Sequence, residues 1–156
     1  MAKPKYEPIE LQDATLLFPN FAGVPNQFNK AGDRNSCVLI DDALAGQLSA
    51  IGWNVRIGKS SDPDVIPGKF ISFTVNTDAK FPPRLWLIRQ GRRPELMAPE
   101  DFNILDFARF KSVSLKINHY IWQEKPQKVS GFLEEGFFEL QPDPLRDRYF
   151  AVDGQA

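Results

Sequence analysis

Few side chains in this sequence could perform acid–base or nucleophilic chemistry. His119 is the only histidine and Cys37 is the only cysteine, so a catalytic triad or a histidine-ligated zinc site would depend on single residues. His119 lies between Ile117 and Ile121 in an alternating segment, which predicts a half-buried histidine whose ring is hydrogen-bonded within the fold. Cys37 begins an apolar run and is predicted to be an inert thiol in the core.

Carboxylates occur in several close pairs, namely Asp41 and Asp42, Asp62 and Asp64, Asp101 and Asp106, and Glu134 and Glu135. None of these pairs has a spacing typical of a metal-dependent nuclease, and the first pair is better explained as the start of a helix. The stretch from Gly91 to Pro94 lacks the glycine spacing of a phosphate-binding loop. The sequence therefore predicts no catalytic residue, no metal site and no cofactor.

Positive charge is concentrated in residues 80–94, a stretch with five cations and no acidic residue in a chain whose net charge is −1. Alternation predicts a strand there, with Leu85 and Leu87 on one face and Arg84 and Trp86 on the other. An aromatic ring beside arginines suits a single-stranded nucleic acid, because bases stack on the ring while cations contact the phosphates. The alternative is a soluble edge strand with Trp86 in the core.

A second alternating segment, residues 111–122, also carries aromatic and basic side chains on one face. The residues predicted from these patterns to bind nucleic acid, loop cations included, are Lys30, Arg34, Arg84, Trp86, Arg89, Arg92, Arg93, Lys116, Tyr120, Trp122, Lys125 and Lys128. Alternation does not say which face is wet, so the aromatics could instead pack in the core and the loop cations could be ordinary solvated charges. Trp53 is expected in the core.

Length and composition predict one globular domain. The 156 residues suffice for one hydrophobic core, and 13 Phe with 13 Pro favour β-strands and many turns. A pI of about 5.9 confines any contact with nucleic acid to a local groove. A lone cysteine suits a reducing cytoplasm, and no apolar run approaches the ~20 residues that span a bilayer, so we expect a cytoplasmic protein without a membrane partner.

The predicted elements are strand, strand, helix and then several strands. Asp41 or Asp42 is expected to cap the helix and Gly52 to end it. Residues 101–107 form either a helical turn or an irregular crossing, and the fourth and fifth strands are expected to pair as a hairpin. The strands are expected at residues 9–18, 37–40, 53–57, 71–75, 84–90, 111–122 and 129–140.

The predicted fold class is mainly β, an OB-like small barrel with one helix after the second strand. Residues 1–8 are expected to form a flexible lead-in and residues 9–140 the single domain. Residues 141–156, which are rich in proline and charge, are expected to form a loosely ordered tail.

Short blocks along the chain form a further pattern: Phe21-Ala22-Gly23, Asn29, Gly32, Arg34-Asn35, Gly52-Trp53-Asn54-Val55 and Leu105-Asp106. With the strands that follow them, to about Leu140, these blocks resemble the single-stranded DNA-binding proteins of tailed bacteriophages. The resemblance implies an OB-fold protein that coats single-stranded DNA without base specificity and has no cofactor or chemistry of its own. It also places Arg34 and Asn35 beside the DNA groove.

Two features depart from that family pattern. Ser36 follows Arg34-Asn35 where a larger, often aromatic residue is expected, which weakens the case for stacking at this point. The C-terminal segment is only mildly acidic, with three aspartates among residues 141–156 against two arginines. Recruitment of replication partners through an acidic tail is therefore not predicted.

The leading hypothesis is a non-enzymatic, sequence-independent protein that coats and protects single-stranded DNA in phage replication, recombination or repair. Its partner is single-stranded DNA, with replication or recombination proteins as further candidates. The alternative is a protein-interaction or structural β-barrel module of a phage replisome or virion, whose arginines meet an acidic protein. A metal-dependent nuclease ranks third.

Overall fold

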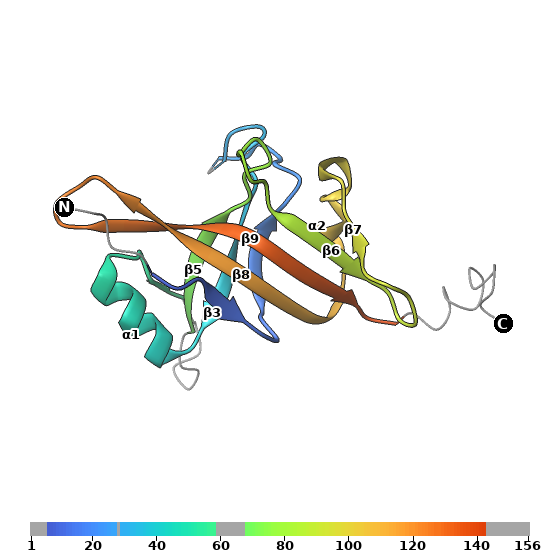
Figure 1. Cartoon of the computed structure of the whole chain (residues 1–156), viewed down its shortest axis with the longest axis horizontal. Coiled ribbons are helices and arrows are strands. Elements are labelled where there is room, and N and C mark those ends of the chain that lie inside the picture. Colours follow the sequence, from blue (N-terminus) through green and yellow to red (C-terminus); the bar gives the residue numbers. More distant parts are fainter. Residues whose placement is uncertain (1–5, 28, 59–67, 143–156) are drawn as a thin grey trace.

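The computed structural model describes residues 6–27, 29–58 and 68–142 (Figure 1). Residues 1–5 of the predicted lead-in and residues 143–156 of the predicted tail lie outside the described part. The described part is mainly β, as predicted. Its elements are β1 (Ile9–Leu11), β2 (Leu16–Asn20), β3 (Asn35–Ile40), α1 (Asp42–Ile51), β4 (Arg56–Ile57), β5 (Lys69–Thr74), β6 (Arg84–Ile88), β7 (Glu95–Leu96), the 3-10 helix η1 (Pro99–Asp101), α2 (Ile104–Phe107), β8 (Phe110–Trp122) and β9 (Lys128–Leu140).

Strand β9 is the centre of the sheet. One edge of β9 pairs with antiparallel β8 over the length of both strands, and together they form the long ribbon that crosses the molecule in Figure 1. The other edge takes two parallel partners in turn, β5 beside Gly131 and Phe132 and then β6 from Glu135 to Glu139. The predicted hairpin between β5 and β6 is therefore wrong: each strand pairs with β9 instead of with the other.

The segment that contains β1 and β2 brings the two ends of the sheet together. The sheet order is β1-β8-β9-β5-β3-β2, so its two ends are consecutive pieces of one segment. The Ala14 N–H donates to the Val113 carbonyl, and the Leu39 N–H donates to the Thr15 carbonyl. The single predicted strand over residues 9–18 is thus two strands, because left-handed backbone at Asp13 (φ 50°) turns the chain from β8 toward β3. This partly closed barrel agrees with the predicted OB-like class.

Helix α1 has the predicted limits. The Asp41 carboxylate accepts a hydrogen bond from the Leu44 N–H at 2.7 Å, and Gly52 ends the helix in left-handed backbone (φ 110°). The next predicted strand, 53–57, is shorter than expected, since only Arg56–Ile57 forms β4. Residues 99–107 form η1 and α2, so the helical alternative holds for that segment and the described chain has a second short helix.

The core lies between the barrel strands and α1. The inward residues Val113, Leu115 and Ile117 of β8 are buried, as is Trp53. The Trp53 indole N–H donates to His119 Nδ1 at 2.9 Å, and His119 Nε2 lies 3.0 Å from the Glu7 carbonyl oxygen. Because Nδ1 accepts, Nε2 carries the proton and donates. His119 is therefore the hydrogen-bonded structural histidine that was predicted.

Gly131 of β9 allows Trp53 to pack against the sheet, because a Cβ at this position would overlap the Trp53 ring. Gly131→Ala is expected to lower the free energy of unfolding by about 1–3 kcal/mol through overpacking. Gly46→Ala is the matched control, since Gly46 lies in α1 with open space around it and alanine there should stabilise the protein by about 0.5–1 kcal/mol. Urea denaturation measures both, and a Gly131→Ala protein as stable as the wild type would contradict this packing.

Burial raises the pKa of the Cys37 thiol, against a smaller lowering by Arg56. The thiolate is the reactive form, so the folded protein should keep Cys37 protonated at mildly alkaline pH. We expect a thiol reagent to label the native protein far more slowly than the urea-unfolded protein. Equal labelling rates in the two states would show that Cys37 is accessible and ionised in the native fold.

Candidate nucleic-acid interface

Alternate side chains of β8 and β9 point away from the core and form one surface, which we call the outward face. The register pairs Trp122 with Lys128 at one end of this face and Ser112 with Glu139 at the other. Strand β6 pairs in register with β9 and extends the same surface. The fold thereby brings together six of the predicted residues, Arg84, Trp86, Lys116, Tyr120, Trp122 and Lys128.

The clearest stacking site lies at the hairpin end of β8 and β9. Tyr120 is 52 % exposed and Trp122 is 41 % exposed, and their rings meet edge to face with centroids 5.1 Å apart. The Trp122 indole N–H donates to Ser130 Oγ at 2.7 Å, and Lys128 Nζ lies 5.1 Å from the Trp122 ring centroid. Two rings held in place beside a cation can accept a base and a phosphate together.

The second aromatic site lies where β6 meets β9. Trp86 is half-buried, and its ring is nearly parallel to that of Phe137, with an interplanar angle of 8° and centroids 6.5 Å apart. Leu85 and Leu87 point into the core, as the alternation predicts. Trp86 therefore belongs to the surface, and Phe137, which the sequence patterns did not single out, lies beside it on the outward face.

The remaining predicted cations, apart from Arg34, lie on turns and loops. Arg89, Arg92 and Arg93 are exposed in the turn between β6 and β7, and Lys125 is exposed in the turn between β8 and β9. Lys30 is exposed on the loop between β2 and β3. In OB folds the face of strands two and three and the loops between strands one and two and between strands four and five bind the ligand, and Lys30 and Lys125 lie on the two corresponding loops of this chain.

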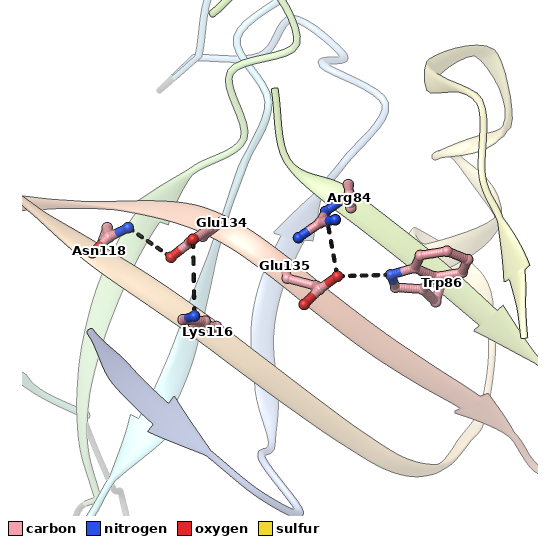
Figure 2. Close-up of polar contacts among 6 residues, drawn as sticks. All are labelled: Arg84, Trp86, Lys116, Asn118, Glu134 and Glu135. Atoms are coloured by element: carbon pink, nitrogen blue, oxygen red, sulfur yellow. Dashed lines mark hydrogen bonds and ion pairs between the residues drawn. The ribbon is translucent and has the colours of Figure 1, made fainter. Parts of the chain in front are cut away.

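A β-bulge places two carboxylates in the middle of the outward face. Lys116 pairs with Glu135 and Ile117 with Leu133, which leaves Glu134 as the extra residue of β9. The bulge turns the two carboxylates toward opposite neighbours (Figure 2).

Glu134 accepts a hydrogen bond from Asn118 Nδ2 at 2.7 Å and lies 3.9 Å from Lys116 Nζ. Glu135 accepts from the Trp86 indole N–H at 3.0 Å and lies 3.4 Å from Arg84 Nε. The two cations at the centre of the face are therefore paired within the protein. Sequence patterns gave no sign of this, because two adjacent glutamates reach the same face only when a bulge is present.

Further exposed aromatics lie outside the predicted set. Phe18 of β2 is 73 % exposed and has left-handed backbone (φ 50°), and its ring meets the edge of the Phe70 ring. Phe81, on the connection between β5 and β6, has Lys80 Nζ 5.6 Å from its ring centroid. A phenylalanine with positive φ is strained, and such strain often marks a binding site. The only signal in the sequence was the unusual number of phenylalanines.

Within residues 6–27, 29–58 and 68–142, no group of three or more histidine, cysteine or acidic side chains could hold a metal ion. None of the helices in this described part is long and apolar enough to cross a membrane.

The sequence matches the family model "Putative phage ssDNA-binding domain" over residues 1–154. The chain belongs to this family. This match confirms the resemblance seen in the short sequence blocks. Comparison with curated protein sequences finds no match.

The fold is similar to that of the single-stranded DNA-binding protein from bacteriophage Enc34. The structure of that protein in complex with single-stranded DNA has a TM-score of 0.53 and 10 % identity and covers 88 % of each chain. A second structure of the protein has a TM-score of 0.51 and 12 % identity and covers 94 % of this chain and 87 % of that one. At these identities the likeness concerns the fold.

Most of the blocks that resemble the phage family form one structural cluster, and only the block at Gly52–Val55 lies apart from it, against His119 and Gly131. The Asp106 carboxylate accepts hydrogen bonds from the Phe21 and Ala22 N–H groups at 2.7 and 3.1 Å. Arg34 Nη1 donates to the Phe21 carbonyl at 2.6 Å and to the Pro99 carbonyl at 3.2 Å. These contacts tie the loop after β2 to the segment before β8, so the blocks hold a loop in place.

This cluster gives Arg34 and Asn35 a structural role that the sequence did not predict. The Arg34 guanidinium also lies over the Phe102 ring, and Asn35 Nδ2 donates to Asn29 Oδ1 at 2.7 Å. Both side chains therefore brace the loop, and contact with DNA stays a prediction for them. Ser36 is fully buried and donates to the Cys37 carbonyl at 3.1 Å, so a ring at position 36 would enter the core instead of stacking on a base.

Trp122→Ala tests the hairpin-end stacking site. Removal of an exposed ring that stacks on a base costs about 1–3 kcal/mol, so binding of an oligo-dT should weaken by roughly 5- to 150-fold. Phe107→Ala removes another well-exposed ring, from α2 and outside the outward face, and should leave affinity unchanged. Fluorescence anisotropy measures both variants, and an equal effect of the two would argue against a dedicated site at Trp122.

Proposed function

We propose that this chain is a non-enzymatic, sequence-independent single-stranded DNA-binding protein that coats and protects single strands during phage DNA replication, recombination or repair. The outward face acts as the binding surface. Bases stack on its exposed rings, while lysines and arginines on the face and its borders contact phosphates. Work in the host cytoplasm and contact with replication or recombination proteins belong to the same proposal.

The observation that carries the proposal is the pair of exposed, fixed rings at the hairpin end. Tyr120 and Trp122 are exposed and lie outside the core. Hydrogen bonding of Trp122 to Ser130 and the nearby Lys128 ammonium keep the indole in place with ring surface accessible. A preformed platform reduces the entropy that binding would otherwise cost.

Charge at the borders of the face supports the same function. Among the described residues, no carboxylate lies within ion-pair distance of Arg89, Arg92, Arg93 or Lys125. Unpaired cations at both ends of a stacking surface attract phosphates without reading bases. Local positive charge thus coexists with a near-neutral chain.

The outward face also sets a length for the bound strand. Trp122 pairs with Lys128, and Trp86 pairs with Phe137, nine positions further along β9. At about 3.3 Å per residue the two aromatic sites lie roughly 30 Å apart. A strand that occupies both sites must therefore cover this distance, within the range of about 4–16 nucleotides known for OB folds.

Anisotropy of labelled oligo-dT tests the proposal, with matched duplex DNA as competitor and at two salt concentrations. Binding should prefer the single strand, and the logarithm of the affinity should fall linearly with the logarithm of salt, by about 0.7 per phosphate contacted. Oligomers near 16 nucleotides should bind more tightly than those near 4, because only the longer ones reach both aromatic sites.

Two results would contradict the proposal. Failure to bind oligo-dT at low salt, together with salt-insensitive association with another protein, would favour the protein-interaction module. Magnesium-dependent loss of the labelled oligonucleotide would show a nuclease and overturn the non-enzymatic part.

A further inference from the structure

The Glu135 carboxylate occupies the place on the outward face where a phosphate oxygen would be expected. A single oxygen, Oε2, accepts from the Trp86 indole N–H and pairs with Arg84 Nε (Figure 2). Guanidinium and indole N–H groups are donors that serve a phosphate oxygen equally well. The arginine of the β6 aromatic site is thus neutralised by the protein itself before any ligand arrives.

We propose that Glu135 is an internal competitor of the DNA backbone, which holds Arg84 and Trp86 until a phosphate displaces the carboxylate from the guanidinium. This inference rests on the proposed function and concerns how the same face is regulated. Arg84 is the more exposed partner of the pair, since its side chain is 63 % exposed whereas that of Glu135 is 20 % exposed. The guanidinium can therefore turn toward a ligand while the carboxylate stays on the sheet.

Glu135 is better placed for this part than the other carboxylates of β9. The Glu134 side chain is 38 % exposed and lies 3.9 Å from its cation, and Glu139 lies 3.8 Å from Lys111. Glu135 is the least exposed of the three and makes the shortest ion pair, so its charge is the least screened by solvent. It is also the carboxylate that accepts a hydrogen bond from a stacking ring, the Trp86 indole.

The competitor makes binding at β6 conditional on stacking. A phosphate whose base is not stacked at this site meets the Arg84–Glu135 ion pair, which has no net charge, and is repelled by the carboxylate. A base stacked beside Trp86 and Phe137 holds its phosphate near Arg84, which raises the local concentration of phosphate at the guanidinium and favours its exchange for Glu135. Glu135 therefore lowers affinity for single strands but lowers non-specific attraction of other polyanions more.

Glu135→Gln tests the proposal, because the glutamine oxygen can still accept from Trp86 while the charge is lost. We expect oligo-dT to bind this variant about two- to fivefold more tightly than wild type at low salt, with a log–log salt slope steeper by about 0.7. Asp42→Asn is the matched control: it changes net charge equally and also breaks an ion pair, that with Lys69 at 3.3 Å, but it lies in α1 outside the outward face, so affinity should stay within about 1.5-fold of wild type.

A double-mutant cycle with Arg84→Gln identifies the cation involved. In the wild-type background Arg84→Gln should change affinity little, because Arg84 exchanges one anion for another. In the Glu135→Gln background it should abolish the gain. An equal cost of Arg84→Gln in both backgrounds, or a Glu135→Gln affinity no higher than that of Asp42→Asn, would overturn the proposal.

Glu135→Asp provides a second variant should Glu135→Gln fail to fold, as judged by circular dichroism. It keeps the net charge but withdraws the carboxylate from Arg84, so a gain in affinity cannot come from net charge, and an unchanged or lower affinity would count against competition. Wild-type protein measured alongside separates the two questions. If it ignores oligo-dT, the proposed function fails, whereas wild-type binding without a gain in the variants refutes only the competitor.

Discussion

The hydrogen bonding of both edges of β9 is the constraint on which the rest of the structure depends. Because β8 occupies one edge and β5 and β6 share the other, the two faces of β9 are separated completely. Its inward residues Leu133 and Phe138 build the core, while its outward residues line the proposed interface. The bulge at Glu134 interrupts this separation and places the carboxylates among the cations.

Electrostatics divides this face into unequal parts. At the hairpin end, Lys128 lies over a ring and no acidic residue competes for it among the described side chains. At the centre, Glu134 and Glu135 neutralise Lys116 and Arg84. A near-neutral protein can thus bind a polyanion locally, since the cations of this face that have no carboxylate partner among the described residues lie toward its two ends.

Local signals in the sequence predicted local structure well. The caps of α1 depend on contacts within four residues, and the pattern of β8 depends only on the alternation of apolar and polar side chains along the strand. Strand partners were not predictable in this way, because β6 pairs with a segment about 50 residues away. The site showed the same limit: residue types indicated stacking and phosphate contact, but whether Arg34 or Arg84 was free depended on Phe21, Pro99 and Glu135, each brought near by the fold.

The central claim is that single-stranded DNA lies on the outward face of β8, β9 and β6. Photo-crosslinking with oligo-dT that carries 5-iodouracil, followed by mass spectrometry of the linked peptides, tests this claim most directly. The account predicts crosslinks at the outward rings, with Tyr120 or Trp122 at the hairpin end and Trp86 or Phe137 beside β6. Crosslinks confined to α1 or α2, with none on these four rings, would contradict it.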